Sequence, residues 1–326
     1  MPESVALRLG VLLVGSAALV ALAAPWLAPL DPARQFDPAY ARHLPPRSER
    51  LAVELSDGRV LLAESVRRSA GTLELERDGV TVSVPLADVV PDARGEAATP
   101  IRFPLGTDHL GRDVLSRLLH AARASMIVGL LATGLALTLG IAAGSVAAMS
   151  GGWVDTVLMR GVDALLALPR LFLILLVTSL ARPDPLVVVL VLGATGWMQI
   201  SRLTRAQVLA LKGSDLEVAA RATGRHPLGV FTRHLLPNAV TPLLVDVTLR
   251  IGDLILVEAA LSYLGLGIQP PVPSWGNMIA DGSNALRTAW WVATPAALAT
   301  TLTVLGFHLL GDGLRDRLDP RRSVGL

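Results

Sequence analysis

The sequence of 326 residues contains no cysteine. Disulfide bonds, thiol catalysis and metal sites with cysteine ligands are therefore excluded. The chain has one lysine, Lys212, and the residue before it is Leu211. A phosphate-binding loop of the type G-x-x-x-x-G-K-[ST] needs a glycine directly before the lysine, so the chain does not bind ATP by that route. ATP-driven work would require ATP and magnesium in partner subunits.

Charged residues make up only 17% of the chain and aromatic residues 4%, whereas 52% of the residues are hydrophobic. The mean hydropathy is +0.54. These values are typical of a polytopic membrane protein, and a net charge of +2 gives no indication of nucleic-acid binding. The sequence has neither a Ser-His-Asp order nor an H-E-x-x-H motif. We therefore predict an all-α integral membrane protein that is not an enzyme, with no metal site and no cofactor of its own.

Six stretches are apolar over about the 20 residues that cross a bilayer. They cover residues 7–30, 125–149, 162–181, 185–200, 241–264 and 289–310. The first stretch also resembles a signal peptide, because Arg8 precedes an apolar core and Ala21-Leu22-Ala23 offers small residues for cleavage. Apolar residues continue beyond Ala24 to Leu30, which favours a retained helix. Cleavage would leave five spans.

Positive charge is distributed unequally among the polar segments. The loop between the third and fourth stretches contains one arginine, Arg182, whereas the segment after the fourth stretch and the C-terminal tail carry Arg202, Arg205, Lys212, Arg221, Arg225, Arg233, Arg315, Arg317, Arg321 and Arg322. Cytoplasmic loops are enriched in Lys and Arg, so we expect these positive segments in the cytoplasm. With six spans, the N-terminus is then also cytoplasmic and the loop after the first span is external.

Residues 33–100 form a polar insert in that external loop. Apolar and polar residues alternate on both sides of Asp57-Gly58 and of Asp78-Gly79. Asp-Gly between alternating runs is typical of a β-hairpin, so we predict two hairpins and a module of four strands. The insert is either a stabilising addition, which we favour, or a docking surface.

The segment EVAARATGRHPLGVFTRHLLPN, residues 217–238, is too polar to cross a bilayer. It contains a pair of small residues, a glycine, nine further residues and then His-x-Leu-Pro-Asn, and it resembles the EAA loop of binding-protein-dependent ABC transporter permeases. The residues that carry this resemblance are Glu217, Ala219, Ala220, Gly224, Pro227, His234, Leu236, Pro237 and Asn238. In the family the glutamate directly precedes the alanine pair, whereas Val218 holds that place here. One residue turns a helical side chain by about 100°, so Glu217 is not expected to make the family's contact.

The resemblance implies two short helices within residues 214–238 that dock in a groove of an ATPase subunit. Gly224 is suited to end the first helix in a left-handed conformation, and Pro227 to begin the second. Three further stretches resemble C-type subunits of dipeptide, oligopeptide and nickel permeases. They are Phe103–Arg123, Leu261–Ile279 and Leu309–Arg321. We expect a first transmembrane helix in residues 1–32 and the permease domain in 101–326, with the insert at 33–100 outside the family pattern.

The family resemblance further implies a multi-pass protein of the bacterial inner membrane. Its expected partners are a second permease subunit, two cytoplasmic ATPases and an external solute-binding protein. The expected function is import of di- or oligopeptides by alternating access, with nickel chelates or another small solute as the alternative. A carrier or channel acting alone would be expected to show inverted repeats, and we find no convincing repeat.

The fifth apolar stretch carries several ionisable residues, which inside a span normally face a water-filled path or a partner. Asp246 precedes Arg250 by four residues, the favourable order for a helical ion pair. Candidate residues of a translocation path are Asp163, Asp246, Arg250, Asp253 and Glu258. The alternative is neutralisation within the protein, including pairs with Arg160 and Asp163.

The motif GTDHLGRD offers Asp108, His109 and Asp113 as metal ligands or as an acid–base set. Its two glycines instead favour turns, and we expect Asp108 or Thr107 to cap the helix that follows. The other histidines considered, His226, His234 and His308, are expected to pack or to form hydrogen bonds rather than to bind metal.

Overall fold

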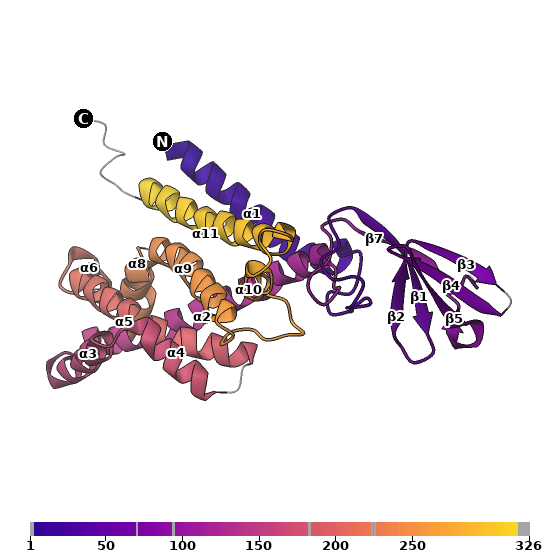
Figure 1. The fold of residues 1–326 in the computed structure, drawn as a ribbon. Coiled ribbons are helices and arrows are strands. Elements are labelled where there is room, and N and C mark those ends of the chain that lie inside the picture. Colours follow the sequence, from indigo (N-terminus) through magenta and orange to yellow (C-terminus); the bar gives the residue numbers. More distant parts are fainter. Residues whose placement is uncertain are drawn as a thin grey trace. The chain divides into compact units, whose positions relative to one another are not determined.

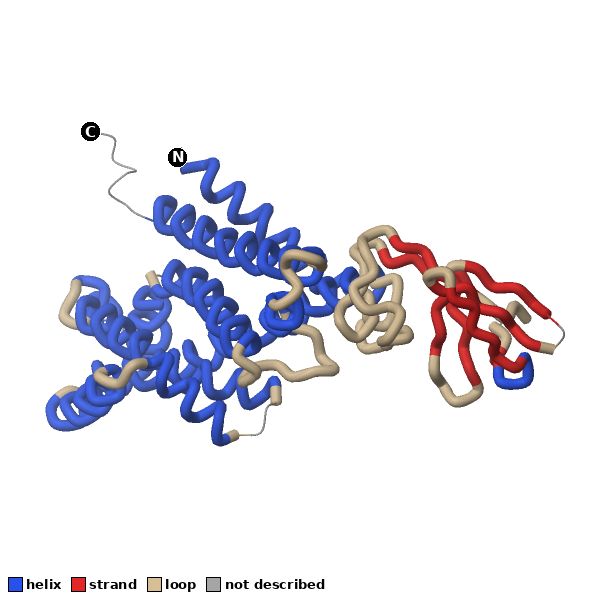
Figure 2. The backbone as a smooth tube through the Cα atoms, in the orientation of Figure 1, coloured by secondary structure: helices blue, strands red, loops and turns tan. Residues whose placement is uncertain are grey.

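The computed structural model describes residues 3–69, 71–92, 95–181, 184–222, 224, 226–240 and 242–318. The protein is mostly helical with a small β region (Figures 1 and 2). The chain divides into two compact units. Unit 1 comprises Met1–Ala18, Ser125–Gln269 and Thr300–Leu326, and unit 2 comprises Leu19–Ala124 and Pro270–Ala299.

The described residues contain both long and short helices. The long helices are α1 (Glu3–Leu27), α2 (Val114–Ser150), α5 (Pro185–Leu211), α9 (Leu243–Tyr263) and α11 (Trp290–Leu318). The shorter ones are α3 (Gly152–Leu166), α4 (Arg170–Leu180), α6 (Asp215–Ala222), α7 (Pro227–Val230), α8 (Leu236–Val240) and α10 (Trp275–Ser283). By length and composition, four described helices qualify as membrane spans, namely α1, α2, α5 and α11, and the bent pair α3–α4 brings the number to five.

The six predicted stretches differ from these helices in three respects. Residues 162–181 form parts of two helices, α3 and α4, which are bent by 81°. Pro169 lies at the bend. Proline interrupts a helix because it lacks an amide hydrogen and disfavours the helical conformation of the residue before it. Helix α9 is apolar over most of its 21 residues, but its four charged residues keep it from qualifying as a span by composition. Helix α5 continues through Arg202 and Arg205, which we had expected in a loop.

Glycine allows α2 and α5 to approach closely within unit 1. A methyl group on Gly144 of α2 would lie 2.3 Å from the carbonyl oxygen of Ser201 in α5. A methyl group on Gly140 would lie 2.6 Å from Cβ of Ile200. Small residues let helix backbones approach closely in membrane proteins, and these two glycines provide that approach here.

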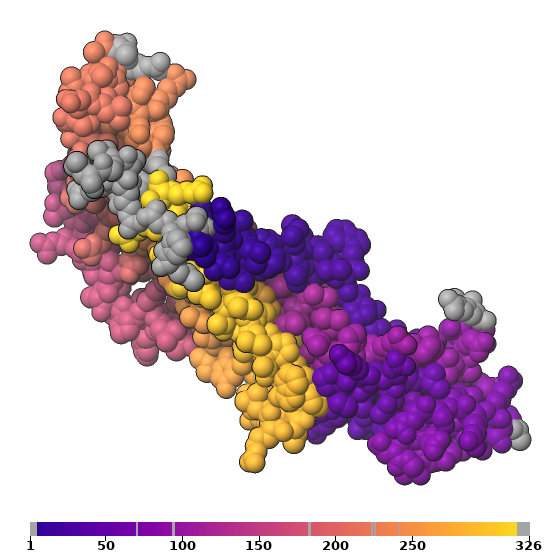
Figure 3. Space-filling view, turned by 90° about the horizontal axis from the view of Figure 1, so that it is seen from above, coloured from indigo at the N-terminus to yellow at the C-terminus, as the bar shows by residue number. Residues whose placement is uncertain are grey.

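The N-terminal part of α1 packs along α11, and Figure 3 shows the two lying side by side. A methyl group on Gly306 or Gly313 of α11 would lie 2.7 Å from Cβ of Leu13 or Leu7, respectively. Gly10 of α1 meets the backbone of Leu310 in the same way, at 2.5 Å. Three glycines therefore seat α1 on α11 within unit 1.

The β region of unit 2 consists of two small antiparallel sheets. In the first, β1 (Ser48–Leu55) pairs with β2 (Val60–Ala63), β6 (Val89–Val90) and β7 (Thr99–Phe103). The second has the order β3 (Ser65–Ser69), β4 (Thr72–Arg77), β5 (Val80–Pro85). The two expected hairpins are present as β1–β2 and β4–β5, and Gly58 and Gly79 have the positive φ values of 83° and 79° that their turns require.

The prediction of four strands is wrong, because the described residues of this region form seven. Strand β3 has the sequence SVRRS, without apolar alternation, and β6 is only two residues long. Such strands carry too little pattern to be identified from sequence. The apolar residues that do alternate form a buried cluster contributed by both sheets: Val53, Leu55, Ala63, Leu73, Leu75, Val84 and Val89.

The approach of α2 to α5 generates a prediction about two glycines of α2. Gly144→Ala should lower the thermal unfolding midpoint of the detergent-purified protein, because overpacking costs about 1–3 kcal/mol. The matched control is Gly134→Ala, since a methyl group on Gly134 meets nothing within 4 Å. That change should be neutral or slightly stabilising, because alanine is favoured over glycine inside a helix by about 1 kcal/mol. Equal midpoints for the two variants would contradict the close approach.

Candidate functional site

Residues 212–240, here called the short-helix segment, form a packed part of unit 1. Among its described residues, the buried apolar ones are Ala220, Val230, Phe231, Leu235 and Ala239. They pack against Ala148 near the end of α2 and Val208 near the end of α5. The segment is therefore held to the ends of two long helices and is not a solvated connector.

The junction between α6 and α7 has the geometry expected from its glycine and proline. Gly224 follows α6 with φ of +73°, a conformation that favours glycine. Pro227 is the first residue of α7, and Nδ1 of His226 accepts a hydrogen bond from the Leu228 amide at 3.4 Å. Thr223 and Arg225 lie outside the described residues. Gly224 thus follows the end of α6, and Pro227 begins α7.

Glu217 is buried and fixes the beginning of α6. Its Oε2 accepts a hydrogen bond from the Gly213 amide at 2.6 Å, and its Oε1 accepts one from Nη2 of Arg221 at 2.7 Å. The Gly213 amide and the Arg221 guanidinium hold the pKa of Glu217 below its usual value. Val218, at the place of the family's glutamate, is 61% exposed. The shift of one residue has therefore turned the carboxylate inward and a valine outward.

The remaining residues of the predicted loop divide between its surface and its interior. Exposed are Ala219, Gly224, Pro227, Pro237 and Asn238, half-buried are His234 and Leu236, and buried is Ala220. The segment also exposes three larger apolar side chains, Leu216, Val218 and Leu228. At its start, Nζ of Lys212 donates a hydrogen bond to the carbonyl oxygen of Ala148 at 3.1 Å. The short-helix segment thus exposes apolar side chains while its buried residues hold it to the ends of α2 and α5.

Three of the ionisable residues of α9 line a polar cavity of about 180 Å³ in unit 1. Arg250 forms an ion pair with Asp246, and its Nη1 donates a hydrogen bond to Oε1 of Gln199 at 3.1 Å. Asp253 lies 3.4 Å from Nε2 of His308. The residues of α9 that line the cavity are Asp246, Leu249, Arg250, Asp253 and Leu254. Asp246 and Arg250 are thus paired within α9 and also border a cavity, and a translocation path along this face stays a prediction.

Two other candidates for a translocation path lie elsewhere. Glu258 is fully buried, and its Oε1 accepts a hydrogen bond from Ser262, whose Oγ accepts one from the Ile268 amide at 2.9 Å. It therefore stabilises the turn that follows α9. Asp163 is exposed and lies 3.5 Å from Arg202, so it is not paired with α9. Neither residue lines the polar cavity.

Sequence reasoning identified only the charged residues that α9 contributes to the polar cavity, and among those it missed are Arg170 and Gln199. Arg170 is the first residue of α4 and directly follows Pro169 at the bend. A lone arginine inside an otherwise apolar stretch was the available signal. Its neighbours across the cavity could not be identified without the fold, because α4, α5 and α9 are distant in sequence.

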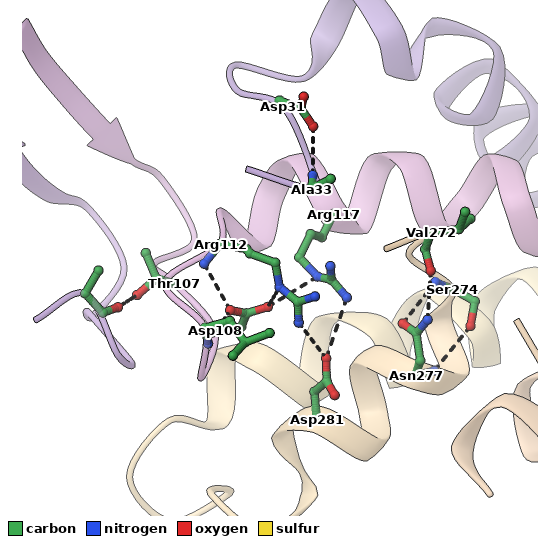
Figure 4. Close-up of polar contacts among 12 residues, drawn as sticks. Asp31, Ala33, Thr107, Asp108, Arg112, Arg117, Val272, Ser274, Asn277 and Asp281 are labelled. Atoms are coloured by element: carbon green, nitrogen blue, oxygen red, sulfur yellow. Dashed lines mark hydrogen bonds and ion pairs between the residues drawn. The ribbon is translucent and has the colours of Figure 1, made fainter. Parts of the chain in front are cut away.

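Two residues of the motif GTDHLGRD, Asp108 and Arg112, form a cluster with Arg117 and Asp281 in unit 2, in which all but Asp281 are buried (Figure 4). Nε of Arg112 donates to Oδ2 of Asp108 at 2.6 Å, and Nη2 of Arg112 donates to Asp281 at 3.0 Å. Arg117 lies 3.4 Å from Asp108. Oxygen and nitrogen atoms of Asp108, His109 and Asp281 lie within 4.8 Å of one another, but a cation there would have to displace the arginines. The two arginines thus occupy the space between the two carboxylates, and the expectation of no metal site stays a prediction.

The residue that caps α2 is not one of the two expected. Asp113, directly before α2, accepts a hydrogen bond from the Ser116 amide at 2.7 Å, which is the N-cap arrangement. Asp108 instead accepts hydrogen bonds from the amides of Leu110 and Arg112 within its own turn. Burial raises the pKa of Asp113. A residue of the motif therefore caps α2, as predicted, but it is Asp113 and not Asp108 or Thr107.

The hydrogen bonds of Glu217 generate a prediction about pH. Because its folded-state pKa is depressed, the carboxylate stabilises α6 above its ordinary pKa of 4.5, and this contribution is lost as pH falls through the lower folded-state value. At pH 7, Glu217→Gln should speed amide exchange in α6 by about three- to tenfold. The control is Asp215→Asn, an exposed residue of the same helix. A Glu217→Gln variant that exchanges like the wild type at pH 7 would contradict this role.

The ion pair of α9 generates a second prediction. Arg250→Ala should lower the thermal midpoint of the purified protein, because Asp246 then loses its cation in a site where its side chain is only 31% exposed. Asp246→Ala combined with Arg250→Ala should recover part of the loss, with a coupling energy of about 0.5–3 kcal/mol. Strictly additive losses would mean that the two charges are independently hydrated.

More than half of the chain matches a known protein family, and about two thirds of it aligns with known proteins. Residues 136–324 match the family described as binding-protein-dependent transport system inner membrane component. The chain is 41% identical over 220 residues to the di/tripeptide transport system permease protein DppC of Pseudomonas aeruginosa, covering 68% of this chain and 73% of that protein. It is 38% identical over 216 residues to the oligopeptide transport system permease protein OppC of Bacillus subtilis, covering 66% and 71%.

A solved structure of the methionine ABC transporter MetNI matches with a TM-score of 0.52 at 16% identity, covering 62% of this chain and 97% of that chain. This likeness shows the fold of an ABC importer permease and nothing more specific. The family match spans more than half of the chain and includes the described part of the short-helix segment and α9. The chain therefore belongs to the family of inner membrane components of binding-protein-dependent transport systems, and it is a permease component of an ABC transporter.

Proposed function

We propose that this chain forms half of the translocation path of an ATP-driven importer for di- or oligopeptides. The observation that carries the proposal is the short-helix segment, which is anchored to α2 and α5 through Ala148 and Val208 and exposes an apolar surface. The names of the similar permeases support peptides as the substrate class. The charged polar cavity supports a zwitterionic solute rather than an apolar one.

The proposed partners are a second permease subunit, two cytoplasmic ATPases and an external solute-binding protein. In this assembly the exposed residues of the short-helix segment, including Val218 and Leu228, enter a groove of an ATPase. ATP and magnesium are held by the ATPases and no cofactor by this chain. Because protein interiors are close-packed and transmit strain, closure of the ATPases would move the ends of α2 and α5 and switch the cavity from inward- to outward-facing.

The proposed topology has six spans, with both termini of this chain in the cytoplasm and residues 33–100 outside. It counts α3–α4 as one broken span and α9 as a span whose charges face the polar cavity instead of lipid. The contacts of Gly10, Gly306 and Gly313 support retention of α1 as the first span. The β region would then be an external domain with a core of its own.

The proposal is tested by the ATPase activity that co-purifies with the tagged chain in mild detergent. Val218→Asp should reduce this activity at least about tenfold, because burying an unpaired carboxylate at an interface is strongly unfavourable. Val80→Asp is the matched control, since Val80 of β5 is 62% exposed and Val218 is 61% exposed. It should leave the activity unchanged.

Peptide uptake by the same complex in proteoliposomes completes the test. A chain that purifies alone, without ATP hydrolysis, would overturn the importer proposal in favour of an independent carrier or channel. A complex that hydrolyses ATP but transports only nickel chelates would contradict the proposal that peptides are the substrate.

A further inference from the structure

Arg170 borders two adjoining cavities in unit 1. One is the polar cavity of about 180 Å³ described above, and the other, here called the apolar cavity, has about 230 Å³. Both are lined by Arg170, Gly196 and Gln199. The bend at Pro169 places the arginine at this junction, because Arg170 begins the helix that leaves the bend. A solute that occupies both cavities would have to pass the guanidinium group.

The guanidinium group of Arg170 is incompletely paired. Its Nε and Nη2 atoms are buried and have no hydrogen-bond partner among the described residues. Buried polar groups normally have partners, and a buried charge without one is costly. Among the nearby charges, Arg250 pairs with Asp246, and Asp253 lies 3.4 Å from Nε2 of His308 and also attracts Arg170 electrostatically. Arg170 is therefore a cation at the wall of both cavities, and its Nε and Nη2 donors would reach a ligand after the buried side chain turns toward a cavity.

The surroundings of Arg170 differ on its two sides. The apolar cavity is lined on one side by Leu165, Leu166, Leu168, Leu173 and Met198. The polar cavity presents two carboxylates, of Asp246 and Asp253, and one further guanidinium, of Arg250. An anion is favoured at Arg170, a cation is favoured beside Asp253, whose side chain is 60% exposed, and an apolar group is favoured beyond the arginine.

From this arrangement we infer that Arg170 binds the terminal carboxylate of a peptide during its passage, with the apolar cavity receiving the adjacent side chain. The planar guanidinium forms two parallel hydrogen bonds with a carboxylate, which would satisfy both Nε and Nη2. The free amino group of the peptide then lies on the side of Asp253. This inference rests on the proposed peptide transport and adds a requirement for a free C-terminus.

The test compares L-alanyl-L-leucine with its C-terminal amide, using the assembled permease–ATPase complex without nucleotide or binding protein. Equilibrium dialysis of the labelled peptides measures binding to wild type, Arg170→Gln and Arg170→Lys. Wild type should bind the free acid at least about tenfold more tightly than the amide, because a charge-assisted hydrogen bond is worth that factor or more. Arg170→Gln should abolish the difference by weakening binding of the acid alone. Arg170→Lys should retain part of the difference, because lysine keeps the charge but loses the paired donors.

Arg202→Gln is the control, since Arg202 is an exposed arginine of α5 that pairs with Asp163 and does not line either cavity. It should keep the wild-type preference. Arg170→Gln removes two buried hydrogen-bond donors that have no partner among the described residues, so its thermal midpoint should not fall, and loss of acid binding with an unchanged midpoint would support the subsite. Acetate added as a competitor separates a general carboxylate site from one that also uses the peptide. If acetate competes at the same concentration as the peptide, the site recognises carboxylates in general, and the inference that it also recognises the rest of the peptide is overturned.

Equal binding of acid and amide by wild type, or no binding of either up to millimolar concentration, would overturn the inference. ATP hydrolysis and peptide uptake by the same complex test the proposed function separately. Uptake without a preference for the free acid would therefore reject the Arg170 subsite and leave the importer standing.

Discussion

Both candidate sites depend on the close backbone approach of α2 and α5. Gly144 of α2 brings the helices together where the short-helix segment begins, so that Ala148 and Val208, one turn further along their helices, form a single apolar base beneath it. Near the middle of α5, Gly196 lies against Ala136 of α2, and both residues line the polar cavity. A larger side chain at the crossing would separate the two helices and disturb both places at once. The close approach therefore provides a short mechanical path between the two sites.

Electrostatic pairing explains how α9 can carry four charged residues and still belong to a membrane domain. Asp246 and Arg250 neutralise each other one helical turn apart, and Asp253 faces His308. Glu258 is held by Ser262 at the end of the helix. Paired charges in a span are far less costly than single ones. What remains is the guanidinium of Arg170, whose Nε and Nη2 have no hydrogen-bond partner among the described residues, although Asp253 attracts it electrostatically.

The sequence predicted what local pattern controls. Apolar runs located five of the long helices, the Asp-Gly turns located both hairpins, and Gly224 and Pro227 located the break between α6 and α7. The bend at Pro169 was missed because hydrophobicity continues through Leu168 and Leu171. Strand β3 was missed because its residues do not alternate. The polar cavity was out of reach because Arg170, Gln199 and Arg250 meet only in the fold. Glu217 is buried because it binds the Gly213 amide and the Arg221 guanidinium, four residues away on either side. The spacing allows these contacts, but only the structure shows that they form.

The single lysine has a consequence for experiments on this protein. Lys212 is the only side-chain amine in the chain, and it joins the end of α5 to the carbonyl end of α2 through Ala148. An amine-reactive fluorophore would therefore label the side chains of this subunit at one place, between the membrane helices and the segment proposed to meet the ATPase. The absence of cysteine leaves thiol chemistry free for a second label at any chosen residue. The natural sequence is thus already prepared for two-colour distance measurements across its own coupling region.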